Sequence, residues 1–156
     1  MIKLEENPNC LLFNIHVKKM IVPKSYNLSR YEIFYSKNPP IMTIKQFIDY
    51  LMSFNLVEHE NLHISQIYCI ALLQKLFRKG FSINMNNCHR IILIMLMLTS
   101  KLIEDECHYN GSWARVSGLD LEELNKMEYT MLQLLDFDIF VSQEQLIHIN
   151  KSFFIK

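Results

Sequence analysis

The chain has 156 residues, of which 50% are apolar, and this is enough for one domain with a buried core. Sixteen basic residues balance sixteen acidic ones, so the chain lacks the basic excess typical of nucleic-acid-binding proteins. Only three glycines are present, which argues against a glycine-rich phosphate loop. No secretory-signal pattern is visible, and the longest apolar run, Ile91–Leu98, is far shorter than the about 20 residues that cross a bilayer.

The four cysteines include no C-x-x-C pair, which favours an intracellular protein with reduced thiols. Two of them, Cys88 and Cys107, directly precede histidines, whereas zinc ligands of one pair are normally two to five residues apart. Adjacent residues of a helix point about 100° apart, so we expect no metal site. A nucleophilic Cys107 beside His108 or His89 is the only candidate for catalysis, and an unreactive thiol is the preferred interpretation.

Residues 1–41 contain all four prolines, and we expect an N-terminal arm over residues 1–37. A short helix around Leu28–Phe34 is the most regular structure that this segment predicts. The apolar residues between Leu11 and Val17 would pack on the domain or on a partner.

The first three helices have clear sequence signals. Thr43 and Gln46 have the spacing of a capping box, which predicts a helix over residues 43–55. A second helix is predicted over residues 63–79, with Gly80 as its stop signal. Asn84 or Asn86 is expected to cap a third helix, which runs to about residue 105.

Residues 106–119 contain Gly111 and Gly118 and are predicted to form a turn. Trp113 and Tyr109 would pack this turn, or the indole would be exposed at a partner surface. Asp120 and Glu123 then predict a fourth helix that ends at about residue 135. Ser142 and Gln145 have the same spacing and predict a fifth helix that runs to the end of the chain.

The pattern predicts one all-α domain of five helices over residues 38–156, plus the arm. The third helix is apolar on all sides from Ile91 to Leu98, which is typical of a helix surrounded by others. We therefore expect the third helix to be central, with the other four wrapped around it.

Two charges stand in apolar surroundings. Glu128 interrupts the apolar face of the fourth helix, and a carboxylate there needs a partner or access to water. Lys101 follows the buried part of the third helix, and an i, i+4 pair with Asp105 or a stem that reaches water would explain it. Alternatively, both charges await a partner protein at a partly apolar surface.

The stretch from His89 to Val141 resembles a cyclin box of the phosphate-pathway type, also called P- or U-type. Dissimilar residue types recur there in the family's order and spacing. The matching residues are His89-Arg90, Ser100-Lys101-Leu102, Asp105, Tyr109-Asn110, Ala114-Arg115-Val116, Gly118, Glu123-Leu124-Asn125-Lys126-Met127-Glu128, Leu135, Phe137 and Val141-Ser142.

The resemblance implies a single cyclin box, a five-helix fold with a central third helix. It implies a non-catalytic regulatory subunit that binds and activates a cyclin-dependent serine/threonine kinase by positioning the kinase's regulatory helix, in cell-cycle or phosphate signalling. The kinase-interface positions of the family fall on Lys101, Leu102, Glu128, Leu132 and Phe137.

We expect no cofactor, and the neutral charge and short apolar run predict no nucleic-acid or membrane partner. We expect the chain in the cytoplasm, the nucleus or both. Without its kinase, the exposed interface would allow a homodimer. The alternative is a helical protein–protein adaptor that has the cyclin fold and activates no kinase.

Overall fold

The computed structural model describes residues 31–38 and 40–153, and this part of the chain contains helices and no strands. The all-α prediction is confirmed. Two 3-10 helices and six α-helices follow in chain order: η1 (Glu32–Phe34), α2 (Ile44–Met52), η2 (His59–Asn61), α3 (Leu62–Arg78), α4 (Cys88–Ile103), α5 (Asn110–Ser117), α6 (Leu121–Leu134) and α7 (Gln143–Phe153).

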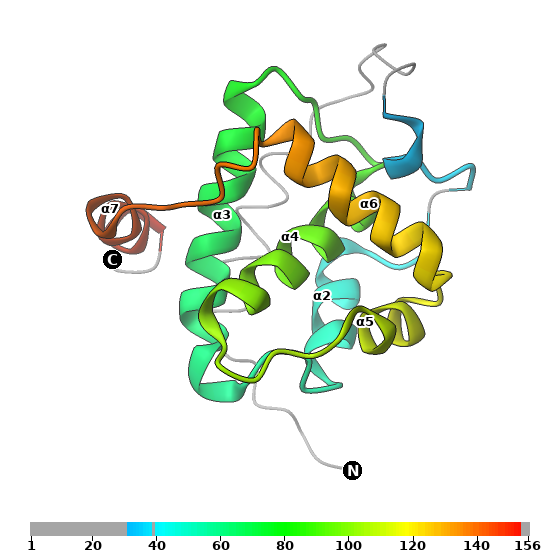
Figure 1. Cartoon of the computed structure of the whole chain (residues 1–156), viewed down its shortest axis with the longest axis horizontal. Coiled ribbons are helices and arrows are strands. Elements are labelled where there is room, and N and C mark those ends of the chain that lie inside the picture. The colour runs from blue at the N-terminus through cyan, green and yellow to red at the C-terminus, as the bar shows by residue number, and fades with distance from the viewer. Residues whose placement is uncertain (1–30, 39, 154–156) are drawn as a thin grey trace.

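Helix α4 lies in the middle of the bundle, with α3, α2 and α6 packed against it (Figure 1). From Cys88 to Ser100 all its residues are buried except the half-buried Arg90. A helix this apolar on all sides is stable in water only when other elements cover it. The expectation of a central third helix is therefore confirmed.

Local signals set several helix ends. At the start of α2 the Gln46 amide donates to Thr43 Oγ1 (3.2 Å), and the Thr43 amide donates to Gln46 Oε1 (2.9 Å), so the capping box is present. Gly80 has φ +80°, which allows the chain to turn after α3.

The expected asparagine cap of α4 is wrong in its detail. The N-cap residue is Asn87, and its side chain makes no capping hydrogen bond. Instead, Asn87 Oδ1 accepts from the Asn84 amide (2.7 Å), and Asn84 Oδ1 accepts from the Asn86 amide (2.9 Å). The asparagines therefore stabilise the turn that leads into α4.

The prediction of a turn over residues 106–119 is wrong, because helix α5 occupies most of it. Its Trp113 and Ala114 are buried, and α5 packs against α6. Gly118 has φ +72° and ends the helix. Trp113 is thus a core residue, while Tyr109 just before α5 is exposed. The described part of the domain has six α-helices instead of the five expected.

The described end of the predicted arm packs on the domain. Phe34 of η1 is fully buried, and η1 lies against α6. From α4, Arg90 Nη1 donates to the Ile33 carbonyl (2.8 Å) and to Glu123 Oε1 of α6 (2.6 Å). The residues from Leu11 to Val17 lie outside the described part of the chain.

Candidate functional site

The two charges singled out in the sequence are paired with each other. Lys101 Nζ, at the end of α4, lies 2.5 Å from Glu128 Oε1, in the middle of α6. The two side chains are 31% and 16% exposed, so the pair is partly buried. The sequence had suggested an i, i+4 ion pair between Lys101 and Asp105. In the described residues Lys101 pairs with Glu128 and not with Asp105.

Asn110, the first residue of α5, completes the environment of Glu128. Its side-chain amide donates to Glu128 Oε2 (2.7 Å) and to Asn125 Oδ1 (2.7 Å). Both carboxylate oxygens of Glu128 are therefore hydrogen-bonded, which offsets the cost of removing the charge from water. Sequence reasoning missed this role of Asn110, because three separate helices bring these groups together.

Apolar residues lie near both charges in the sequence. Leu102 is exposed beside Lys101, and Leu132 is half-buried one turn after Glu128. Tyr129 and Phe137 are 57% and 58% exposed, and their ring centroids lie 6.2 Å apart. We call this region the α4–α6 surface and define it by Lys101, Leu102, Asn110, Glu128, Tyr129, Leu132 and Phe137.

Phe137 lies three residues after the end of α6 in an unusual backbone conformation. Asp136 and Phe137 have φ values of +53° and +56°, in the left-handed region. The Phe137 amide donates to the Leu132 carbonyl (2.7 Å), which closes the last turn of the helix. A bulky residue rarely adopts this conformation, so its neighbours must stabilise it.

The two buried cysteines of the described residues, Cys69 and Cys88, are not placed as reactive thiols. Burial raises the pKa of Cys88 to about 11, and burial raises the pKa of Cys69 even further. Such thiols stay protonated at neutral pH and are poor nucleophiles. Cys88 Sγ lies 3.4 Å from His89 Nδ1, but residues 31–38 and 40–153 contain no group of three or more His, Cys, Asp and Glu side chains that could hold a metal ion.

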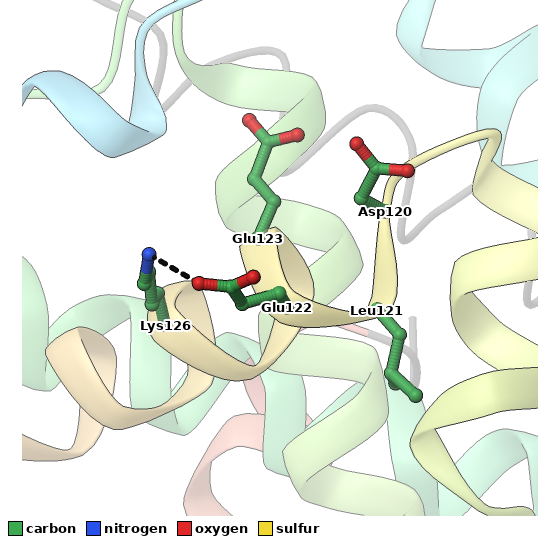
Figure 2. A pocket seen from close by; sticks show the side chains of 5 residues that line it. All are labelled: Asp120, Leu121, Glu122, Glu123 and Lys126. Carbon is green, nitrogen blue, oxygen red and sulfur yellow. Dashed lines mark hydrogen bonds and ion pairs between the residues drawn. The ribbon is translucent and has the colours of Figure 1, made fainter.

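A surface cavity of about 620 Å³ lies at the first turns of α6 (Figure 2). Its lining is mostly charged, and Lys126 Nζ is paired with Glu122 Oε1 at 2.8 Å. None of the five residues predicted for the kinase interface lines it. The lining residues are Asp120, Leu121, Glu122, Glu123 and Lys126.

Within the described part of the chain, no helix has both the length and the apolar character needed to span a bilayer.

The described fold belongs to the class of all-α domains in which other helices surround one buried helix. A comparison with protein-family models identifies this class, because the Cyclin model matches residues 7–139. The chain therefore belongs to the cyclin family. Cyclins are non-catalytic, in agreement with the expectation that the chain is not an enzyme.

The relatives confirm the U-type and phosphate-pathway resemblance. Cyclin-U2-2 of Arabidopsis thaliana is 28% identical over 129 residues, which are 83% of this chain and 55% of the relative. Cyclin-U1-1 of the same plant is 26% identical over 143 residues, 86% of this chain and 67% of the relative. PHO85 cyclin-7 of Saccharomyces cerevisiae is 26% identical over 123 residues, 72% of this chain and 43% of the relative. The chain spans about half the length of most of these relatives.

Proposed function

We propose that this chain is the regulatory subunit of a cyclin-dependent serine/threonine kinase. The support is its membership of the cyclin family, with relatives named U-type and PHO85 cyclins. Binding would place the chain in the cytoplasm or nucleus, where its kinase acts. The α4–α6 surface is the proposed contact, and it would be free for self-association when no kinase is present.

The structural observation that carries the proposal is the Lys101–Glu128 ion pair, together with the apolar residues of the α4–α6 surface. A partner that docks here meets one positive and one negative side chain at fixed positions, and an apolar group placed over them would remove them from water at a cost. The exposed rings of Tyr129, which follows Glu128 in sequence, and of Phe137 offer apolar area. This combination suits the backbone and apolar side chains of a partner helix.

The proposed mechanism is selection of the active kinase conformation. Phosphoryl transfer requires the kinase's regulatory helix to supply a glutamate to an active-site lysine. A cyclin that binds this conformation better shifts the equilibrium toward it. A change from 1:99 to 99:1 takes about 5.5 kcal/mol of differential binding.

The test is a binding and activation assay with a panel of purified cyclin-dependent kinases. We expect wild type to bind and activate one of them. Lys101→Glu or Glu128→Lys should each weaken binding by a factor of at least about 30, since removing a charge that is hydrogen-bonded across an interface costs about 2 to 5 kcal/mol. The matched control is reversal of the exposed pair Glu122–Lys126 on the same helix, which should leave binding unchanged.

A double reversal separates interface from stability. The chain with both Lys101→Glu and Glu128→Lys regains an internal ion pair and should recover its thermal stability. Kinase binding should stay weak, because the partner would meet the opposite pattern of charge. Recovery of binding together with stability would show that the pair serves only the fold.

Other outcomes identify the alternative. Binding without activation would make the chain a helical adaptor with a cyclin fold. Failure of wild type to bind any kinase in the panel would refute the proposed function.

A further inference from the structure

The segment that joins α6 to α7 crosses α3 (Figure 1). Two lysine side chains, of Lys75 and Lys79, bind it there. We call residues 135–142 the connector. Lys75 Nζ lies 3.0 Å from the Asp138 carbonyl, 2.6 Å from the Phe140 carbonyl and 2.9 Å from Asp138 Oδ2. One ammonium group thus faces three acceptors, the number of protons that it can donate.

Lys75 is the shielded member of this set of contacts. Its side chain is only 15% exposed, whereas that of Asp138 is 67% exposed. Its hydrogen bond holds the pKa of Asp138 below the usual range. One turn further along the chain, Lys79 forms an ion pair with Asp136. Both ends of the sequence from Asp136 to Phe140 are therefore tied to the same helix.

Phe137 stands between these anchored positions. Its left-handed conformation and that of Asp136 are less favourable than ordinary helical backbone for residues that carry a side chain. A strained conformation persists only when surrounding contacts determine it. Lys75 binds the backbone on the C-terminal side of Phe137, so its contacts limit how far the connector can relax.

We propose that Lys75 is a positioning residue for partner binding, which holds the connector so that Phe137 remains exposed beside Tyr129. This inference rests on the proposed function, because the partner is the kinase bound at the α4–α6 surface. Lys75 itself lies on α3 and acts through Phe137.

The test measures the kinase affinity of wild type, Lys75→Met, Phe137→Ala and the double variant. Methionine keeps an unbranched side chain but removes the charge and all three donors. We expect Lys75→Met to weaken binding about tenfold and to add little when Phe137 is already alanine, because residues that act through one contact are not additive. Lys126→Met removes an exposed lysine of α6 and should leave affinity unchanged.

Hydrogen exchange provides a readout that does not need the kinase. In Lys75→Met the amides of residues 136–141 should exchange faster, while those of the buried helix α4 should keep their wild-type rates. Faster exchange in α4 as well would mean that Lys75 only stabilises the domain, and would overturn the proposal.

Two binding results would also overturn the positioning role of Lys75. One is a kinase affinity of Lys75→Met equal to that of wild type. The other is a double variant whose loss of affinity equals the sum of the losses of Lys75→Met and Phe137→Ala. If wild type itself binds no kinase, the proposed function fails and the positioning role fails with it. The exchange experiment would then still show whether Lys75 anchors the connector.

Discussion

His89 joins the start of α4 to the segment before α2. Its Nε2–H donates to the Met42 carbonyl (2.8 Å), which leaves Nδ1 as the unprotonated nitrogen, 3.4 Å from Cys88 Sγ. The ring also packs edge-to-face on Phe47, with centroids 5.1 Å apart. Burial lowers the pKa of His89 below its ordinary value of 6.5, and the hydrogen bond to Met42 opposes this only in part.

This lowered pKa makes stability depend on pH. The unfolded chain takes up the histidine proton more readily than the folded chain, so folding is favoured most above pH 6.5. The free energy of unfolding should fall as the pH drops below 6.5 toward the pKa of the folded state. We expect a smaller fall for His89→Gln, measured by urea denaturation at about pH 7.5 and about pH 5.5. Equal falls in the two chains would contradict this account.

The sequence identified Lys101 and Glu128 as unusual, but it did not show that they are partners. Helical spacing reveals only neighbours on the same helix, so Asp105 was the partner within reach. Glu128 lies on another helix, and the packing of α4 against α6 brings it to Lys101. Their place on a protein-binding surface remains a prediction, which the charge reversals test.

At the level of helices, strong periodicity and clear end signals made five helices predictable, with starts correct to within a few residues. These are α2, α3, α4, α6 and α7. Helix α5 carried no such signal. It has eight residues, of which only Trp113 and Ala114 are buried, and it lies between Tyr109 and Gly118 with Gly111 inside it. Its helical form depends on packing against α6, which no local pattern shows.

The capping box of α2 gives a test at this level. Thr43→Ala removes the acceptor for the Gln46 amide and should lower the free energy of unfolding by about 1 kcal/mol. Thr43→Ser keeps a hydroxyl and should retain most of that stability. Chemical denaturation of the three chains makes the comparison. Equal stability of the alanine and serine variants would show that the hydroxyl contributes nothing.

For the molecule as a whole, the described helix before α2, η1, contributes Phe34 to the core. The ring of Phe34 meets that of Phe81 edge-to-face, with centroids 6.2 Å apart, and Arg90 holds the neighbouring Ile33 carbonyl. The sequence placed residues 31–37 in the arm because residues 1–41 contain all four prolines, and it predicted at most a short helix around Leu28–Phe34. The ring of Phe34 is buried because η1 packs against α6 and the ring meets Phe81. These contacts exist only in the folded bundle.

This packing predicts a large effect of one substitution near the start of the described chain. Phe34→Ala should lower the free energy of unfolding by about 3 to 5 kcal/mol, because it empties a fully buried site. The matched control is Phe140→Ala, whose ring is 74% exposed, with an expected change within about 0.5 kcal/mol. Urea denaturation measures both, and similar values for the two variants would contradict the burial of Phe34.

The two helices that carry the charged pair also contain sulfur-rich packing. Met95 and Met97 of α4 and Met127 and Met131 of α6 have no exposed surface. Thioethers become sulfoxides only where an oxidant reaches them, and a sulfoxide is too polar for a closed core. Peroxide would therefore reach these four sulfur atoms only when the domain opens. The rate at which the buried methionines are oxidised is thus set by how often the domain opens.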